Sequence, residues 1–226
     1  MITLAYINRL YRSEEVETTA LRDIELQVNE GEFVAVMGPS GSGKSTLLNI
    51  LGLIDRPTSG RHLFLDQEVS HLGEAERAKV RRETLGFIFQ SFNLIDELTV
   101  EENIELGLAY RGGGSKHRRA KVHDAMDRVG IGHRARHYPH QLSGGQQQRA
   151  AIARAVAGEP RLLLADEPTG NLDTANGAQV MDILKHLNAE GATIVMVTHS
   201  PSQADQAKRV VNMLDGRIVA SARRAV

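Results

Sequence analysis

Several features that define other protein classes are missing from this chain of 226 residues. It contains no cysteine, which excludes a disulfide framework and any cysteine-based metal or redox site. No apolar run approaches the roughly 20 residues that cross a membrane, and residues 1–11 lack the basic-then-apolar layout of a signal peptide. The formal net charge of -1 argues against nonspecific nucleic-acid binding as the main task. We therefore expect a cytoplasmic protein without direct membrane insertion, which reaches a membrane only through a partner.

The chain does contain enough apolar residues for a substantial core, 41% of the total, and we expect one compact domain over residues 1–226. Apolar residues roughly alternate with polar ones at 21–28, which favours antiparallel strands. Residues 180–187 carry apolar side chains at the spacing of a helix that packs on a sheet. Residues 213–219 predict a hairpin that turns at Asp215-Gly216. Helical patterns dominate residues 91–136, and the glycines at 112–114 predict a surface loop that divides them.

A glycine-rich loop at residues 38–46 is the most specific feature of the sequence. The apolar run 34–37 predicts a buried parallel strand before the loop, and a helical pattern follows it. In such a loop, backbone N–H groups turn toward phosphate oxygens, and the helix start adds free N–H groups. The Lys44 amine would reach the β- and γ-phosphates, and the Ser45 hydroxyl would bind Mg²⁺. The predicted nucleotide contacts are Gly38, Pro39, Ser40, Gly41, Ser42, Gly43, Lys44, Ser45 and Thr46.

Two adjacent acids follow a second apolar run, at residues 162–165. Ligands of open α/β sheets bind at the carboxyl ends of strands, so we expect Asp166 and Glu167 at the nucleotide. The Asp166 carboxylate suits the Mg²⁺ shell. Pro168 biases Glu167 toward an extended conformation, which would place its carboxylate to polarise an attacking water and contribute about 10² to 10⁴ in rate. The alternative is a solvated pair of acids in a loop.

A second glycine-rich sequence, at residues 142–146, precedes another helix. A plain helix cap would explain Ser143, but each of Gly144 and Gly145 costs about 1 kcal/mol relative to alanine inside a helix. A helix start that admits a closely approaching phosphate explains both glycines, and we predict that Ser143, Gly144, Gly145 and Gln146 contact nucleotide. Since residues 38–46 already grip the phosphates, this second site implies that two copies of the chain close over ATP.

These motifs, in this order, resemble those of the ATP-binding cassette (ABC) ATPases, and the resemblance covers essentially the whole chain. It implies a magnesium and water contact for Gln90, a γ-phosphate contact for His199 that also orders the attacking water, a nucleotide contact for Asp173, and adenine stacking for Tyr11. Each has a plainer alternative: Gln90 as a polar strand end, His199 as a helix cap, and Tyr11 as edge-strand packing. With Glu167 and Lys44, Gln90 and His199 form the predicted catalytic set.

The resemblance also implies the fold and the activity. The expected fold is an α/β P-loop NTPase of the ABC type: a mixed β-sheet core with an N-terminal antiparallel β subdomain and an inserted helical subdomain at approximately residues 91–160. The expected activity is hydrolysis of ATP to ADP and phosphate, with ATP and Mg²⁺ as cofactors. ATP binding would close a homodimer, and hydrolysis would open it.

Finer details of the sequence look like the MacB, LolD and FtsE branch of the family, including the triple glutamine at residues 146–148 and Gly170-Asn171 where many ABC ATPases have Ser-Ala. That branch serves membrane permeases that export or extract a lipoprotein, peptide or drug. We expect a separate permease chain and a peripheral location on the cytoplasmic face of the inner membrane. The alternatives are a non-transporting transmembrane signalling complex of the FtsE type, which has the same ATP cycle, and a soluble ABC ATPase.

Two further segments have patterns that suggest binding sites, and we expect such a site in the first of them. Phe92, Leu94, Ile95 and Leu98 follow Gln90 and would be costly to leave in water without a use, so we expect a docking groove for a permease helix, with Leu94 as its first exposed candidate. Packing of the helical region is the alternative. His133, His137 and His140 have spacings that suggest a metal site, but Pro139 disrupts a helix face and basic neighbours would repel a cation. We expect a solvated segment there.

Overall fold

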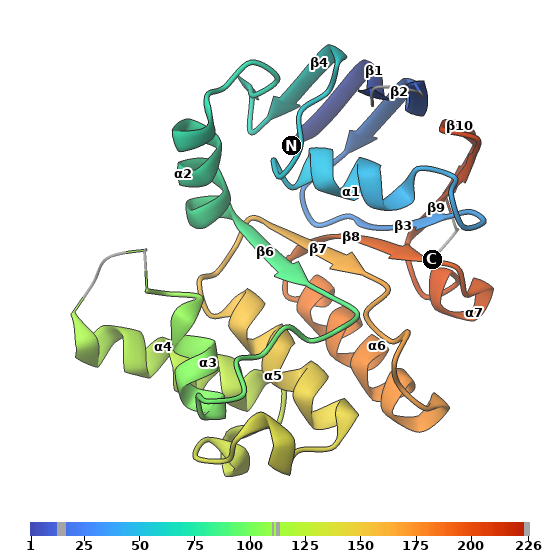
Figure 1. Ribbon diagram of the computed structural model, residues 1–226. Helices are drawn as coiled ribbons and strands as arrows, with labels where there is room; N and C mark the ends of the chain where they lie inside the picture. Colours follow the sequence, from blue (N-terminus) through green and yellow to red (C-terminus); the bar gives the residue numbers. More distant parts are fainter. Residues whose placement is uncertain (13–16, 110, 112–113, 224–226) are drawn as a thin grey trace.

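A computed structural model describes residues 1–12, 17–109, 111 and 114–223. It contains two sheets and a group of helices (Figure 1). The strands are β1 (Ile2–Arg12), β2 (Glu17–Val28), β3 (Phe33–Met37), β4 (Ser59–Phe64), β5 (Gln67–Glu68), β6 (Leu85–Ile88), β7 (Leu162–Asp166), β8 (Thr193–Thr198), β9 (Arg209–Leu214) and β10 (Arg217–Arg223). The helices are α1 (Lys44–Leu51), α2 (Glu74–Thr84), α3 (Val100–Leu106), α4 (Ser115–Arg128), α5 (Gly144–Val156), α6 (Thr174–Ala189) and α7 (Pro201–Ala204), with 3₁₀ turns η1 (Gly132–Arg134) and η2 (Pro139–Gln141).

The larger sheet has the strand order β10-β9-β3-β8-β7-β6. Its central strands are short apolar runs that pair in parallel, with Phe33 opposite Ile194 and Leu162 opposite Thr193. Such runs are buried on both faces, which is why they lack an alternating pattern. Because β3, β6, β7 and β8 all run in the same direction, the loops that follow them lie at one edge of the sheet. That edge holds the candidate site.

The smaller sheet is antiparallel, with the order β2-β1-β4-β5. Leu21, Ile24, Leu26 and Val28 of β2 are all buried, as their alternation predicts. The predicted C-terminal hairpin is confirmed as well: β9 and β10 pair antiparallel, and both Asp215 and Gly216 have positive φ, at 46° and 76°. The mixed β-sheet core and the antiparallel N-terminal sheet that the sequence predicts are therefore confirmed.

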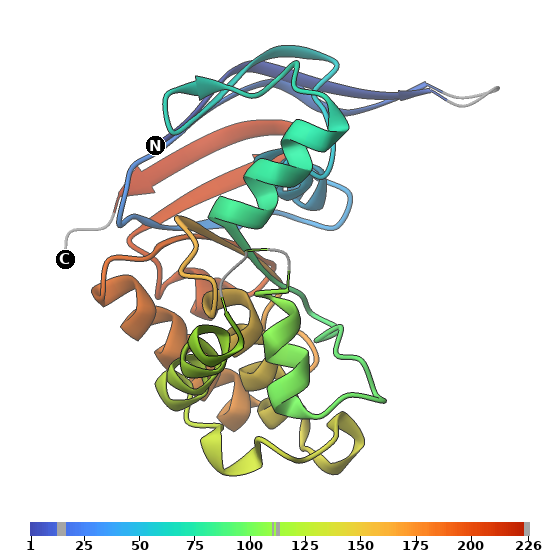
Figure 2. The same cartoon turned by 90° about the vertical axis from the view of Figure 1, so that its left-hand side faces the viewer.

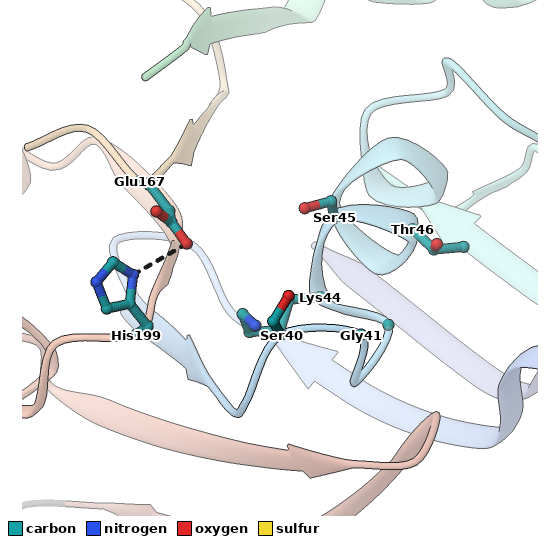
Figure 3. Close-up of a pocket in the computed structure, with 8 residues that line it drawn as sticks. Ser40, Gly41, Lys44, Ser45, Thr46, Glu167 and His199 are labelled. Carbon is teal, nitrogen blue, oxygen red and sulfur yellow. Dashed lines mark ion pairs between the residues drawn. The ribbon is translucent and has the colours of Figure 1, made fainter. Parts of the chain in front are cut away.

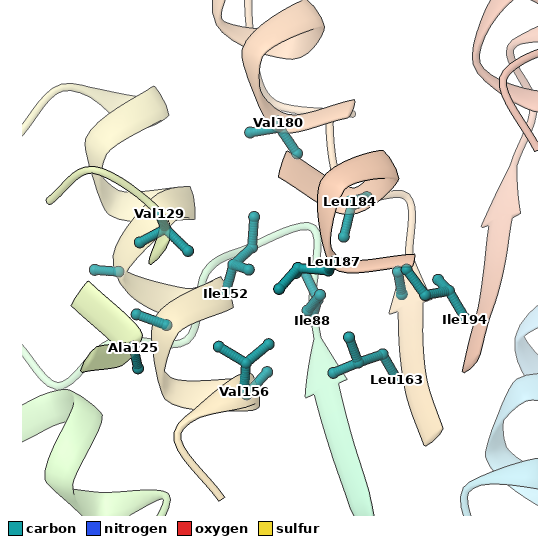
Figure 4. Close-up of a cluster of buried hydrophobic side chains, with 14 of the residues drawn as sticks. Ile88, Ala125, Val129, Ile152, Val156, Leu163, Val180, Leu184, Leu187 and Ile194 are labelled. Carbon is teal, nitrogen blue, oxygen red and sulfur yellow. The ribbon is translucent and has the colours of Figure 1, made fainter. Parts of the chain in front are cut away.

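The larger sheet separates two hydrophobic clusters, because successive side chains of a strand point to opposite faces. Val34 and Val36 face the smaller sheet and α1, and Phe33 and Ala35 belong to the cluster that includes the helices. Figure 4 shows the helical side, where α5 and α6 pack against the sheet through side chains such as Ile152. The result is a layered molecule with the small sheet on one side and the helices on the other (Figure 2).

The helical region contains α3, α4, α5 and the two 3₁₀ turns between residues 100 and 156. Buried residues of all three helices, including Ile104, Met126 and Ile152, share one cluster with the larger sheet. The predicted loop at the glycines 112–114 falls largely outside the described residues. In the part of the chain that is described, no helix combines the length and the apolar character needed to span a membrane.

Candidate functional site

The loop at residues 38–43 connects β3 to α1 at the shared edge of the larger sheet (Figure 3). Gly43 is the N-cap residue of α1 and has a φ of 96°, in the left-handed region. A Cβ there would also lie 2.5 Å from the Ala20 carbonyl oxygen, so both conformation and space require glycine. Among the described residues, no side chain caps the first turn of α1, which leaves its N–H groups available to an anion.

Lys44 is the first residue of α1 and is 7% exposed. Its Nζ donates a hydrogen bond to the Pro39 carbonyl oxygen at 2.8 Å, so the amine lies across the loop. A phosphate held by the loop would offer that amine a charged acceptor in place of the neutral carbonyl. The exposed Ser45 hydroxyl and Thr46 follow on the first turn of the same helix (Figure 3).

The two acids lie where β7 ends. Asp166 is half-buried, and burial, together with the negative charge of Glu167, raises the pKa of its carboxyl, while the nearby Lys44 ammonium lowers it. Glu167 has a φ of 44°, so the prediction that Pro168 holds it extended is wrong. This left-handed conformation is strained for a residue with a side chain, and a hydrogen bond from its backbone N–H to the Val197 carbonyl oxygen, at 3.0 Å, stabilises it.

His199 follows β8, the strand next to β7, and its Nδ1 lies 3.1 Å from Glu167 Oε1 (Figure 3). A cavity of about 490 Å³ opens between this pair and the phosphate loop. Its lining comes from three segments far apart in sequence: Ser40, Gly41, Gly43, Lys44, Ser45, Thr46, Glu167 and His199. Thus Glu167 lies within contact of His199 in spite of its unexpected backbone, and the predicted acid and histidine share one cavity with the phosphate loop.

Gln90 and Asp173 do not line this cavity. Gln90 lies beyond the end of β6 and contacts Asn171, which follows β7. Asp173 is the N-cap residue of α6: its Oδ1 accepts a hydrogen bond from the Asn176 backbone N–H at 2.8 Å, and its Oδ2 accepts one from Asn176 Nδ2 at 2.8 Å. These hydrogen bonds lower the pKa of the Asp173 carboxyl.

The start of α5 lies outside the cavity too. Ser143 is an exposed N-cap residue whose Oγ accepts from the Gln146 backbone N–H at 3.3 Å, and Gln146 Oε1 accepts from the Ser143 N–H at 3.1 Å. This reciprocal capping box leaves the N–H groups of Gly144 and Gly145 without a side-chain cap. No residue of the 143–146 segment lines the cavity beside Lys44.

The two glycines at this helix start have different structural explanations, which corrects the prediction that an approaching phosphate accounts for both. Gly145 is buried, and a Cβ there would lie 2.2 Å from Asn176 Oδ1 of α6. Close packing of two helices therefore accounts for Gly145 without any phosphate. A Cβ at Gly144 would come no closer than 3.4 Å to another residue, at Leu172 Cδ2, so packing does not require glycine there.

Tyr11 is 40% exposed on β1 and does not line the cavity. Its hydroxyl donates to Asp55 Oδ2 at 2.8 Å, and the Arg9 guanidinium carbon lies 4.3 Å from its ring centroid. Burial alone would raise the pKa of Asp55, but hydrogen bonds from Tyr11 and the Arg56 backbone, with the Arg9 charge, lower it. Arg9 and Asp55 are 46 residues apart, and no sequence signal connected them with Tyr11. Adenine stacking by Tyr11 stays a prediction.

The segment after Gln90 differs from the expectation at Leu94. Leu94 is half-buried and packs against the helical cluster, so it is not an exposed side chain. Ile95 is the exposed member, at 43%. The backbone turns sharply at this point, since Phe92 and Asn93 have φ values of 60° and 51°, and this turn directs consecutive side chains to different environments.

A magnesium ion fits the oxygen donors at the sheet edge. The Ser45 hydroxyl and the Gln90 amide oxygen are donors of the kind that Mg²⁺ takes, and a cation would offset the burial and the Glu167 charge that raise the pKa of the Asp166 carboxyl. Within the described ranges, no group of three or more histidines and acids is placed to hold a metal ion by itself, and this includes His133, His137 and His140. Mg²⁺ typically takes one or two protein carboxylates and completes its shell with phosphates and water.

Known proteins with this sequence pattern and fold identify the family. The family described as "ABC transporter" matches residues 21–170. A macrolide export ATP-binding/permease protein, MacB 1/2 of Paracoccus denitrificans, is 53% identical over 99% of this chain and 33% of its own length. The uncharacterised ABC transporter ATP-binding protein MJ1508 of Methanocaldococcus jannaschii is 50% identical over 97% of this chain and 98% of its own. The chain thus spans about a third of the MacB relative and nearly all of MJ1508.

Two solved structures agree with these relatives. The dimeric structure of MJ0796, described as a bacterial ABC transporter cassette, superposes with a TM-score of 0.92 at 43% identity and covers 100% of both chains. A post-hydrolysis state of that cassette, bound to ADP and phosphate, gives a TM-score of 0.91 at 42% identity. Because the family match, the relatives and the fold coincide with the motifs at the sheet edge, this chain belongs to the ABC transporter ATP-binding family and is an ABC ATPase.

Proposed function

We propose that two copies of this chain close over ATP and drive a membrane permease of the MacB type. The observation that carries this proposal is the separation of the start of α5 from the cavity that holds Lys44, Glu167 and His199. A helix start with an exposed Ser143 and free N–H groups suits a γ-phosphate that arrives with a second molecule. The dimeric MJ0796 cassette supports the same arrangement.

In the proposed cycle, the chain first binds the phosphates of ATP. The N–H groups of the loop and of the first turn of α1 face the phosphates, and the Lys44 amine exchanges its Pro39 carbonyl partner for a phosphate oxygen. Ser45, Asp166 and Gln90 would hold Mg²⁺, which would supply positive charge beside the phosphates. The α5 start of the second copy then covers the nucleotide, and ATP closes the dimer because ADP lacks the phosphate that both chains contact.

Glu167 is the proposed general base. Its carboxylate would accept a proton from the attacking water while His199, 3.1 Å away, fixes its orientation and contacts the γ-phosphate. The left-handed backbone of Glu167 supports this role, since strained conformations cluster at functional sites. Release of phosphate would remove the contact between the two copies and open the dimer.

The permease is proposed to dock beside Ile95. A groove of about 420 Å³ lies next to this segment, between the edge strand β6 and the helices α3 and α5, and Phe87, Phe89 and Leu106 contribute its apolar lining. Arg154 lines it as well, and burial lowers the pKa of this guanidinium, which donates to the Phe92 and Asn93 carbonyl oxygens and has no acidic partner among the described residues. A short permease helix with apolar and acidic side chains would suit this lining. Such docking would hold the chain at the cytoplasmic face of the inner membrane.

The proposal can be tested with Glu167→Gln protein and ATP, which should trap the closed dimer on its permease so that the permease can be identified by copurification. When that permease is then reconstituted with chains that keep Glu167, Ile95→Asp should remove most of the ATPase stimulation by the permease and leave the basal rate of the isolated chain unchanged. Val219→Asp is a matched control, because Val219 is also an exposed apolar residue, at 59%. Unchanged stimulation by the Ile95→Asp variant would place the docking site elsewhere.

A further inference from the structure

The loops after β6 and β7 meet through two side-chain amides. Ile88 and Ala165 are paired at the ends of these parallel strands, so the chain segments beyond them run side by side. Asn171 Nδ2 donates to the Gln90 backbone carbonyl oxygen at 3.1 Å, and Gln90 Nε2 donates to Asn171 Oδ1 at 3.1 Å. The Asn171 side chain is thus hydrogen-bonded to both the backbone and the side chain of Gln90.

This pair of hydrogen bonds fixes which atom of each amide faces which partner. A backbone carbonyl can only accept, so Asn171 must present Nδ2 to it and Oδ1 to the Gln90 side chain. Oδ1 can only accept as well, so Gln90 must present Nε2 to it. Among the described residues, none donates a hydrogen bond to Gln90 Oε1. The carboxamide is therefore oriented with its donor end occupied and its oxygen free.

Gly170 provides the space for this arrangement. A Cβ at Gly170 would lie 2.6 Å from Gln90 Nε2 and 3.0 Å from its Cδ. Gly170 is not among the residues with positive φ, so its backbone does not itself demand glycine. The missing side chain is explained by the amide of Gln90 that lies against it.

The two loops are also connected from the helical side. Gln148 of α5 is fully buried, and its Nε2 donates to the Pro168 carbonyl oxygen at 2.6 Å and to the Phe89 carbonyl oxygen at 3.4 Å. These carbonyls belong to the residues directly after Glu167 and directly before Gln90. The backbones of the two loops are therefore held together independently of Asn171, which leaves orientation of the Gln90 side chain as the specific contribution of Asn171.

We propose that Asn171 is a positioning residue: Gly170 leaves space for the Gln90 carboxamide, and Asn171 orients that carboxamide so that its Oε1 is free to act as an oxygen ligand. This inference rests on the proposed role of Gln90 toward Mg²⁺. An outer partner that orients a metal ligand typically contributes about 10- to 100-fold in metal affinity or activity. We place Asn171 at the lower end, about tenfold, because it is exposed.

The first test needs neither metal nor nucleotide. In ¹⁵N NMR spectra of the full chain, the Gln90 side-chain amide is identified by its loss in Gln90→Ala, and its heteronuclear NOE should be that of an ordered group. Asn171→Ala and Gly170→Ala should both lower it to the value of Gln179, an exposed glutamine on α6. A Gln90 amide that is as mobile as Gln179 in the parental protein, or unaffected by both substitutions, would overturn the proposal.

The second test is a double-mutant cycle on the Mg²⁺ concentration that gives half-maximal ATPase activity. Asn171→Ala should raise this concentration about tenfold, and the Asn171→Ala/Gln90→Ala double variant should match Gln90→Ala alone. Gln179→Ala is the control and should behave as the parent. Additive effects would overturn the proposal, because Asn171 would then act by another route. The test uses the isolated chain, so it is independent of whether the permease assignment holds, and parental behaviour of Gln90→Ala would refute the role of Gln90 itself.

Discussion

The cavity beside Lys44 and the start of α5 are both marked by glycines in the sequence, but they are built in different ways. The cavity is assembled from loops that follow β3, β7 and β8, three parallel strands that end at the same edge. The start of α5 is a single local structure, a capping box formed by Ser143 and Gln146. The first surface contains a carboxylate, a lysine amine and a glycine-rich loop, and the second presents a hydroxyl and backbone N–H groups.

This difference shows why one chain holds half of the proposed arrangement. Parallel strands bring residues far apart in sequence to one edge, so Lys44, Glu167 and His199 line one cavity within a single chain. A helix start displays its donors outward, and those of α5 lie away from the cavity of their own chain. In the proposed arrangement, a phosphate bound at the cavity meets such donors because another copy supplies them.

The largest expected effect distinguishes ATP hydrolysis at the cavity from ATP binding. Glu167→Gln should lower the ATPase rate by about 10² to 10⁴ because the amide cannot accept a proton, while ATP affinity stays near that of the parent. Lys44→Ala should instead fail at nucleotide binding. Steady-state ATPase assays and titration with a fluorescent ATP analogue measure the two quantities. Glu25→Gln, at an exposed position of β2, is the control. Turnover close to the parental rate in Glu167→Gln would contradict the assignment of the general base.

The second prediction concerns the α5 surface alone. In the Glu167→Gln background, sedimentation should give a monomer without nucleotide or with ADP, and a dimer with ATP and Mg²⁺. Adding Ser143→Arg should abolish the dimer, because the long side chain fills the space for the phosphate, while each chain still binds ATP. Ser115→Arg, at the start of α4, should leave the dimer intact. The same mass under all of these conditions would refute the proposal that the start of α5 in one copy contacts ATP bound to the other copy.

A third prediction distinguishes the roles of Gly144 and Gly145 at the start of α5. Gly145→Ala should lower the free energy of unfolding by about 1–3 kcal/mol because the new Cβ collides with Asn176. The Gly145→Ala/Asn176→Ala double variant should recover most of that loss in urea titrations. Gly144→Ala should leave stability at or above the parental value but weaken the ATP-dependent dimer. If Gly145→Ala proved as stable as the parent, the packing explanation would fail.

The smallest expected effect concerns neither the cavity nor the start of α5. It tests whether protonation of a buried histidine lowers the stability of the fold at acid pH. Burial lowers the pKa of His62 on β4 from 6.5 to about 4. The unfolded chain therefore binds the proton first, and stability falls as the pH drops below 6.5 toward 4. Between pH 7.5 and 6 the loss should be about 1 kcal/mol. His62→Leu should remove this component of the pH dependence in urea titrations, and an unchanged slope would place the acid sensitivity elsewhere.

The sequence alone determined the order of the motifs and the type of sheet. Apolar runs such as 162–165 are buried parallel strands, and the polar residues after them lie at one edge, because strand direction dictates where chain ends meet. The turn at Asp215-Gly216 follows from local conformational preference, which needs no tertiary information. These features depend on residues close together in the chain or on a rule that holds for all parallel sheets.

Only the tertiary structure decided the features that depend on neighbours distant in sequence. The left-handed backbone of Glu167 opposes the preference that Pro168 imposes, and the Val197 carbonyl on the adjacent strand stabilises it. Asn176 of α6 occupies the space that a Cβ at Gly145 would need, and Gln90 is oriented by the side chain of Asn171, which is 81 residues away. Local propensities are worth about 1 kcal/mol or less per residue, so packing and hydrogen bonds between remote segments override them at these positions.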